Sequence, residues 1–197
     1  MRIWVAIRMT IVLTLLTGIA YPLAMVGLAH LLFPYQANGS LLVHDGQVVG
    51  SALIGQNFSS PRYFHSRPSA AGDKGYDAAN SSGSNLGPTN KTLIETVRSR
   101  VSTLREHEPA INHAAIPVDL VTASASGLDP AITPAAAELQ VRRVANSRGL
   151  SETTVRSLVS AYTHGRTLGV LGEPRVDVLE LNLAIDNLSA GAPHRLN

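Results

Sequence analysis

Residues 9–33 of the chain read MTIVLTLLTGIAYPLAMVGLAHLLF, and this stretch decides the fold class. It contains no Asp, Glu, Lys or Arg, and the first such residue after it is Asp45. As an α-helix it would be about 37 Å long, enough to cross a hydrocarbon core of about 30 Å with some tilt. The rest of the chain is polar and globular in texture. The sequence therefore predicts one transmembrane helix at residues 9–33, followed by a domain outside the bilayer.

The main alternative for this stretch is a cleaved signal peptide, which also begins with positive charge. Signal h-regions span about 7–15 residues and end at a small-residue A-x-A site. Here the apolar run is longer and no such site follows Phe33, so we favour a retained anchor. Arg2 and Arg8 precede the helix, and the positive-inside rule therefore makes residues 1–8 cytoplasmic and residues 34–197 periplasmic. Together with the absence of cysteine, this predicts a single-pass membrane protein with an exported domain; in a bacterium that domain would lie in the periplasm or at the cell exterior.

Small residues recur on one face of the predicted helix, at Thr10, Thr14 and Gly18. Small side chains at i, i+4 and i+8 allow another helix to approach closely, and such packing drives helix association in lipid. We predict that this face binds a partner helix, although Thr and Gly are also ordinary in membrane helices. Pro22 removes a backbone hydrogen bond and predicts a bend.

The outer part combines a little β-structure with several helices, and we predict a single α+β domain. Residues 47–54 are a strand candidate, and residues 117–122 are a short β-rich run. Between them, residues 55–90 form a long loop that is rich in Gly, Ser, Asn and Pro but also carries aromatic residues. Disordered linkers are poor in aromatic residues, so we expect this loop to be ordered on a surface. Residues 90–106 follow it and show the apolar period of an amphipathic helix.

Two further helices are marked by their ends. Thr133 followed by Pro134 predicts a helix start, and Gly149 predicts the end of the same helix. Ser151 predicts the start of the next one. Residues 177–188 fit either an alternating strand or a helix, and we favour the helix.

Catalytic motifs are missing from the sequence. It has no G-x-x-x-x-G-K-[ST] phosphate loop, no G-x-G-x-x-G dinucleotide motif and no G-x-S-x-G nucleophile elbow. The seven histidines include no H-x-x-x-H pair, and without cysteine only carboxylates could complete a metal site. We therefore predict no catalytic residue and no metal site. The expected function is that of a subunit of a membrane assembly; the alternative is a membrane-tethered periplasmic binding protein or hydrolase that acts alone.

Six segments follow the predicted helix in a distinctive order: LIGQNF (53–58), RYFHSRPS (62–69), GSNLGPTN (83–90), VTASASGLDPAITP (121–134), QVRRVA (140–145) and DVLELNLA (177–184). In this order, after one N-terminal membrane helix, they resemble the KdpC family, the C subunit of the Kdp potassium-transporting ATPase. The resemblance covers nearly the whole chain.

The resemblance implies a place in a four-part inner-membrane potassium pump. Its other parts are a channel-like potassium-binding subunit, a P-type ATPase subunit that hydrolyses ATP, and a very small helical subunit. The C subunit of such a pump is non-catalytic and holds the complex together. It is also described as a catalytic chaperone that raises the ATP affinity of the ATPase subunit, and such proteins are often labelled ATP-binding. The predicted topology opposes direct contact, because only residues 1–8 would meet cytoplasmic ATP. We expect no bound cofactor, with ATP and potassium handled by the complex, and no nucleic-acid partner.

The polar loop is the predicted periplasmic contact surface for these partners. The residues assigned to it are polar or aromatic: Gln56, Asn57, Phe58, Tyr63, Phe64, Arg67, Ser84, Asn85 and Asn90. The same side chains could instead hold the loop's own turns through hydrogen bonds to the backbone. Both roles are open on the sequence alone.

Overall fold

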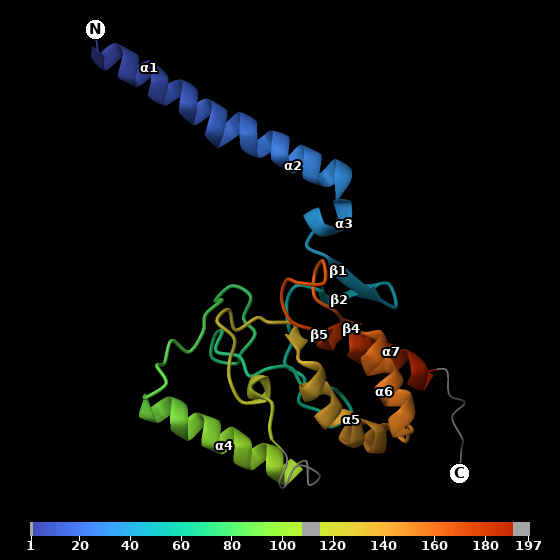
Figure 1. The fold of residues 1–197 in the computed structure, drawn as a ribbon. Helices are drawn as coiled ribbons and strands as arrows, with labels where there is room; N and C mark the ends of the chain where they lie inside the picture. Colours follow the sequence, from blue (N-terminus) through green and yellow to red (C-terminus); the bar gives the residue numbers. More distant parts are fainter. Residues whose placement is uncertain (1, 108–114, 191–197) are drawn as a thin grey trace. The chain divides into compact units, whose positions relative to one another are not determined.

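The computed structural model describes residues 2–107 and 115–190. The chain divides into two compact units, Met1–Ser51 and Ala52–Asn197, and each is described by itself. The first unit begins with α1 (Arg2–Leu15), a π-helical turn η1 (Leu16–Ala20) and α2 (Tyr21–Leu32), which follow one another along a long apolar helix (Figure 1). Within the described residues this helix, Arg2–Leu32, is the one that is long and apolar enough to cross a membrane. It is compatible with a single-pass membrane protein.

The helix predicted at residues 9–33 is confirmed as a helix, with slightly different bounds. It begins already at Arg2 and ends at Leu32. Its end has a local cause, because Phe33 precedes Pro34 and has a φ of −137°, outside the helical region. A residue before proline is disfavoured in the α conformation.

The π turn ends at Ala20, two residues before Pro22, the residue at which the sequence predicts a bend. Pro22 has no N–H and cannot donate to the fourth carbonyl before it. The preceding N–H, that of Tyr21, bonds the carbonyl of Leu16, one residue further back than in an α-helix. The hydroxyl of Thr17 donates to the carbonyl of Leu13 at 2.7 Å, which satisfies this polar group inside an apolar helix. The helix accommodates its proline by widening one turn and continues beyond it.

The first unit ends in a β-hairpin. A short helix α3 (Pro34–Ala37) leads to β1 (Leu41–His44) and β2 (Gln47–Ser51), which pair antiparallel. The two residues of the turn, Asp45 and Gly46, both have positive φ, 50° and 76°, as a type I′ turn requires. The strand predicted at residues 47–54 is therefore present but ends at Ser51. β1 lies outside the predicted elements, because four residues are too few to show a period.

The second unit contains a small antiparallel sheet with the strand order β3-β5-β4 in the described residues. The strands are β3 (Ala131–Ile132), β4 (Thr163–His164) and the central β5 (Arg175–Asp177). Three helices, α5 (Pro134–Arg148), α6 (Glu152–Ala161) and α7 (Val178–Ala190), gather beside this sheet (Figure 1). α5 contacts α6, and α6 contacts α7. The mixed α+β class that the sequence predicts is confirmed.

The helix ends follow the predicted capping residues. The hydroxyl of Thr133 accepts the N–H of Ala136 at 3.1 Å, and Gly149 ends α5 in the left-handed conformation with a φ of 65°. Ser151 caps α6 in the same way as Thr133 caps α5. The ambiguous segment 177–188 is helical from Val178 onward, so the favoured interpretation is confirmed.

Residues 117–122 are not a strand, and that prediction was wrong. Val118–Leu120 forms a single 3₁₀ turn, η3. The carboxylate of Asp119, only 4% exposed, accepts the N–H of Thr133 at 2.7 Å. This tertiary bond draws the segment into a turn and overrides the β preference of its valines.

The hydrophobic core lies among the sheet and α5–α7. Its fully buried side chains include Phe64, Val141, Val144, Val155, Val176, Leu181 and Ile185. Helix α4 (Lys91–His107), predicted at residues 90–106, lies apart from α5–α7 (Figure 1) and has no fully buried residue. Leu104 packs against the core, and Arg100 donates to the carbonyl of Val121 at 2.9 Å. α4 is therefore joined to the unit by a few side chains.

Candidate functional site

The polar loop predicted at residues 55–90 is a long coil held by side chains from elsewhere in the unit. Residues 52–90 form no helix and no strand. Residues 61–65, here called the clamped segment, contact helices α5 and α7 through hydrogen bonds that span 75 to 123 residues of chain. The loop is therefore ordered by tertiary contacts, which agrees with its aromatic content.

Two buried side-chain amides hold the centre of the clamped segment. Asn182 of α7 accepts the N–H of Phe64 at 2.8 Å and donates to its carbonyl at 3.0 Å. Gln140 of α5 accepts the N–H of His65 at 2.7 Å and donates to its carbonyl at 3.2 Å. Each amide thus satisfies both backbone groups of one residue, as a neighbouring β-strand would.

Two arginines hold the start of the clamped segment. Arg143 donates to the carbonyls of Pro61 and Tyr63 at 2.6 and 2.9 Å. The side chain of Arg148 is 2% exposed, pairs with Asp186 at 2.7 Å, and lies 4.7 Å from the centre of the Tyr63 ring. The hydroxyl of Tyr63 donates to the other oxygen of Asp186 at 3.0 Å. The loop backbone and helices α5 and α7 therefore form one network.

The next part of the loop packs on residues 124–130. Arg67 pairs with Asp129 at 2.9 Å, and the hydroxyl of Tyr76 donates to the carbonyl of Arg67 at 2.6 Å. The hydroxyl of Ser69 donates to the carbonyl of Gly127 at 2.6 Å. These bonds fold residues 67–77 into a compact turn that forms one wall of a pocket.

Some of the predicted contact residues are occupied within their own domain. Phe64 is fully buried in the core, and Tyr63 and Arg67 make the bonds described above. Phe58 is half-buried and lies 5.4 Å from Tyr63, centre to centre. Gln56 is also half-buried. The structural role that the sequence left open is thus present for Tyr63, Phe64 and Arg67.

The other predicted contact residues lie at the surface. Asn57, Ser84, Asn85 and Asn90 are exposed. Asn90 is also the N-cap of α4, since its side chain accepts the N–H of Thr92 at 2.8 Å. A role in binding a partner stays a prediction for all nine residues, and these four offer the accessible surface.

In the first unit, the three small residues of the predicted helix face are exposed. A Cβ placed on Gly18 would lie 4.0 Å from the methyl group of Thr14. Gly18 and Thr14 therefore remain adjacent even though Gly18 belongs to the π turn. The partner helix for this face, which also includes Thr10, stays a prediction.

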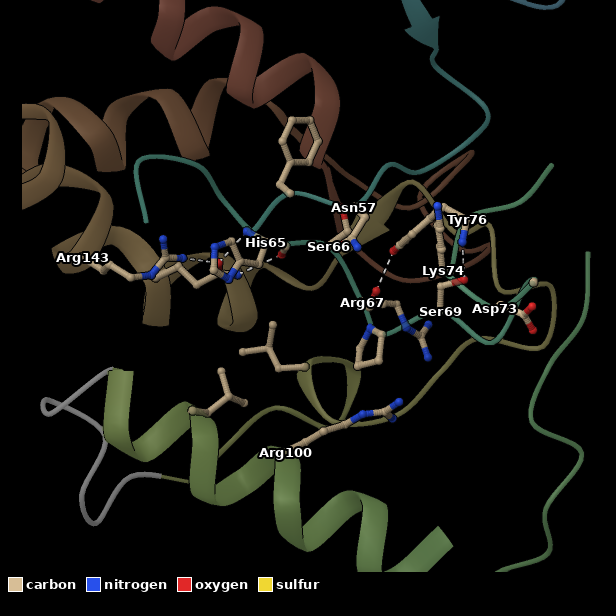
Figure 2. A pocket seen from close by; sticks show the side chains of 17 residues that line it. Asn57, His65, Ser66, Arg67, Ser69, Asp73, Lys74, Tyr76, Arg100 and Arg143 are labelled. Carbon is tan, nitrogen blue, oxygen red and sulfur yellow. Dashed lines mark hydrogen bonds between the residues drawn. The ribbon is translucent and has the colours of Figure 1, made fainter. Parts of the chain in front are cut away.

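A pocket of about 400 Å³ opens between the loop, α4 and α5 (Figure 2). Arg100 enters it from α4, whereas His65 and Arg143 lie on the α5 side. Arg67 and Lys74 line it from the loop. Of the nine residues predicted on the polar loop, the pocket brings three together: Asn57, Phe58 and Arg67.

The charged side chains that line this pocket, among the described residues, are mainly positive. Burial is the main cause that lowers the pKa of His65 below the usual 6.5, and the nearby charges of Arg143 and His107 lower it further. A bond from the ring Nε2 of His65 to the carbonyl of Ser60, at 3.0 Å, opposes the shift. Burial also lowers the pKa of Arg100 from its usual value. Arg100 nevertheless keeps its charge at neutral pH, because an arginine does not deprotonate in a protein, whereas His65 is neutral.

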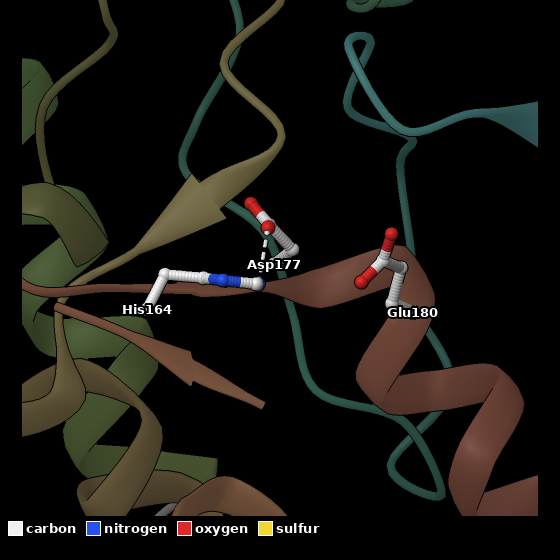
Figure 3. Close-up of side chains that lie close together, drawn as sticks. All are labelled: His164, Asp177 and Glu180. Atoms are coloured by element: carbon white, nitrogen blue, oxygen red, sulfur yellow. Dashed lines mark ion pairs between the residues drawn. The ribbon is translucent and has the colours of Figure 1, made fainter. Parts of the chain in front are cut away.

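One group of potential metal ligands is present among the described residues: His164, Asp177 and Glu180 (Figure 3). His164 Nε2 lies 3.1 Å from Asp177 Oδ2, and the three ligand atoms lie within 4.8 Å of one another. His164 is exposed, and its bond to Asp177 accounts for the geometry. The sequence did not indicate this group, because its members come from β4, β5 and α7.

Sequence reasoning missed the side chains that hold the loop, notably Gln140, Asn182 and Asp186. A signal for two of them exists. Gln140 and Asn182 interrupt the apolar stripes of α5 and α7, and a polar residue at a core position needs a hydrogen-bond partner. Such an interruption identifies a buried polar contact, although it does not tell which backbone is bound.

These features define a class of protein: an α+β domain with one N-terminal helix able to cross a membrane, a loop clamped by buried amides, and a basic pocket. Comparison with known sequences is more specific. A family model described as "KdpC: K+-transporting ATPase, c chain" matches residues 3–187. The chain therefore belongs to the KdpC family.

Individual relatives agree with this membership. The chain is 56% identical to the potassium-transporting ATPase KdpC subunit of Koribacter versatilis, over 92% of each chain. It is 58% identical to the KdpC subunit of Rhodopseudomonas palustris strain BisB18, over 92% of this chain and 95% of the relative. It is also 58% identical to that of Gemmatimonas aurantiaca, over 95% and 94%.

Proposed function

We propose that this chain is a non-catalytic subunit of a Kdp-type potassium uptake complex and that its role is assembly. The observation that carries the proposal is the match of relatives named as potassium-transporting ATPase KdpC subunits over more than nine-tenths of the chain. The apolar helix Arg2–Leu32 supports a place in the membrane part of such a complex. The partners are a channel-like potassium-binding subunit, a P-type ATPase subunit and a small helical subunit.

The orientation belongs to the same proposal. Arg2 and Arg8 stand at the N-terminal end of the helix, and Asp45 is the first charged residue beyond it. The positive-inside rule then leaves the N-terminus in the cytoplasm of a bacterial inner membrane and the outer domain in the periplasm. ATP affinity of the ATPase subunit would be raised by contacts within the complex, since the domain would lie on the side away from ATP.

Two surfaces are assigned to partners. The first is the helix face with Thr10, Thr14 and Gly18, where small side chains permit close packing. The second is the stretch of the loop with Ser84 and Asn85. Both residues are exposed, and neither belongs to the clamped segment. The residues that hold the clamped segment then act indirectly, by fixing the path of the loop.

The helix face is tested by Gly18→Leu in the full chain within the complex. A leucine there blocks the approach of a partner helix, so we expect the ATPase and channel-like subunits to co-purify with a tag on this chain at a clearly reduced yield. Gly27→Leu is the matched control: Gly27 lies on the same helix, outside the predicted face, and a Cβ on it meets nothing within 4 Å.

Equal recovery of both partners with Gly18→Leu and Gly27→Leu would remove this face from the proposal. Purification of the native chain in mild detergent without any large membrane protein would remove the assembly role itself. Orientation is tested in sealed vesicles: protease added on the cytoplasmic side should leave residues 52–190 intact.

A further inference from the structure

The basic pocket between the loop, α4 and α5 contains more positive than negative groups. Four permanent cations line it: Arg67, Lys74, Arg100 and Arg143. The lining carboxylate is Asp73, and the Asp129 carboxylate pairs with Arg67 at 2.9 Å. Among the described residues, these cations outnumber the two carboxylates. Such an excess inside a partly enclosed space attracts anions, because the low-dielectric walls focus the field.

Arg100 is the most informative of these cations. It is half-buried, and among the described residues its guanidinium donates a hydrogen bond to a neutral group, the carbonyl of Val121. Among the described residues, no carboxylate lies within ion-pair distance of its guanidinium, and burial is the cause that shifts its pKa. Removing a cation from water without a counter-charge costs free energy. An anion in the pocket would supply the counter-charge that the described residues do not give to Arg100.

The neighbouring groups suit an oxyanion. The Nε atom of Arg67 is buried and, in the described part of the chain, has no hydrogen-bond partner. Guanidinium groups donate in a planar fork that matches the two oxygens of a carboxylate or phosphate. Leu104, Leu120 and Phe58 form apolar lining beside these donors. At about 400 Å³ the pocket falls within the size range of small-molecule sites.

We propose that this pocket binds an organic oxyanion, with its carboxylate or phosphate group held between Arg100 and Arg67. The anion has two possible sources: a small molecule in solution, or an acidic side chain presented by another subunit. Binding of a small molecule is independent of the proposed assembly role. Binding of an acidic side chain from another subunit rests on the proposed assembly role and adds a contact to it. The apolar lining takes the carbon part of the ligand.

The small-molecule source is tested with the purified full chain in detergent. Citrate and inorganic phosphate are titrated separately at constant ionic strength, and binding is measured by calorimetry and by the rise in melting temperature. We expect Arg100→Gln to weaken citrate binding by about tenfold or more, because a charged hydrogen bond is lost. Arg98→Gln is the matched control, since Arg98 is an exposed residue of the same helix outside this pocket.

Lys74→Gln separates binding from folding. Lys74 is exposed at the pocket and makes no hydrogen bond or ion pair with the described residues, so it can be replaced without disturbing the core. We expect about a two- to fivefold weaker affinity for citrate, as for the loss of an exposed charge. Lys91→Gln, at the exposed start of α4, is the control for this variant.

The subunit source is tested in the complex by washing at increasing potassium chloride. If the isolated chain binds neither probe but Arg100→Gln, unlike Arg98→Gln, releases the chain at lower salt, the anion comes from a partner. Citrate or phosphate binding that depends on Arg100 and Lys74 supports a small molecule. The proposal is overturned if neither probe binds and the two arginine variants dissociate from the complex at equal salt. A complex that forms normally in that case leaves the assembly role intact.

Discussion

At the scale of single residues, the amide of Asn182 links a helix to a coil. Its side chain is 1% exposed, and its two polar atoms are both used by the backbone of Phe64. Burying a side-chain amide costs free energy unless it is hydrogen-bonded. Removing it costs free energy as well, because the buried backbone groups that it bonds are then left without a partner. The position of Phe64 in the core therefore depends on a residue 118 positions later.

Replacing Asn182 with Leu is expected to lower the free energy of unfolding of the domain by about 2–5 kcal/mol, because the N–H and C=O of Phe64 lose their partners. Urea unfolding of the full chain, followed by circular dichroism, measures this. Asn187→Leu is the control, since Asn187 is exposed on the same helix, and it should change the free energy by less than about 0.5 kcal/mol. Similar effects of both variants would show that the side-chain amide of Asn182 does not hold the loop.

His65 gives the domain a pH dependence whose sign follows from its pKa. Burial, followed by the charge of Arg143, lowers the pKa of His65 in the folded state below 6.5. The unfolded chain keeps the usual pKa of about 6.5, and between that value and the lower pKa of the folded state it binds more protons than the folded chain. The free energy of unfolding therefore falls as pH decreases below about 6.5. Above about pH 7.5 the residue is neutral in both states and contributes no pH dependence.

His65→Gln tests this assignment, because Gln can still donate to the carbonyl of Ser60 but does not titrate. Urea midpoints are compared between pH 8 and pH 5.5 for both proteins. We expect the native chain to lose more stability than the variant over this range. An identical loss in the two proteins would assign the pH dependence to other groups.

At the scale of elements, the loop and residues 124–130 approach so closely that glycine is required. Gly127 has a φ of 66°, and a Cβ there would lie 2.5 Å from the carbonyl oxygen of Ser82 and 2.8 Å from the nitrogen of Ala71. Both contacts are with backbone, which cannot move aside as a flexible side chain could. The loop and residues 124–130 thus pack closely against each other although neither segment is helix or strand at this contact.

Gly127→Ala is expected to lower the free energy of unfolding by about 2–4 kcal/mol, from backbone strain and overlap with the facing chain. The melting temperature of the full chain, measured by circular dichroism, reports this loss. Gly87→Ala is the matched control, because a Cβ on Gly87 meets nothing within 4 Å and its φ is not in the left-handed region. A variant as stable as this control would show that the two coils separate without cost.

The elements that could be predicted from the sequence are those with local signals. The long apolar helix, α5 with Thr133 and Gly149 at its ends, and α6 behind Ser151 all depend on periodicity and capping, which are properties of neighbouring residues. β1, η3 and the path of the loop depend on distant contacts, such as the bond from the N–H of Thr133 to Asp119. The pocket could not be predicted for the same reason, since Arg67 and Arg100 line one pocket only in the folded unit.

At the scale of the whole molecule, the predicted membrane helix and the predicted polar loop belong to two different compact units. The first, Met1–Ser51, contains the apolar helix and the hairpin, and the second, Ala52–Asn197, contains the core, the clamped segment and the pocket. The family match extends through both, over residues 3–187. The residues proposed for assembly through the helix face and those proposed for anion binding therefore belong to different units, and each proposal can be tested with variants of its own unit.

The hydrogen bonds from Gln140 and Asn182 to the clamped segment also set an order of events during biosynthesis. A ribosome makes residues 61–65 long before it makes Gln140 and Asn182, and the N-terminal helix is made before either. The N-terminal helix is thus complete while the loop still lacks the groups that hold it. The loop takes its final path only after α7 has been synthesised. A chain truncated before Asn182 would keep its N-terminal helix but would lack the amide that binds the backbone of Phe64, so its loop would be unformed.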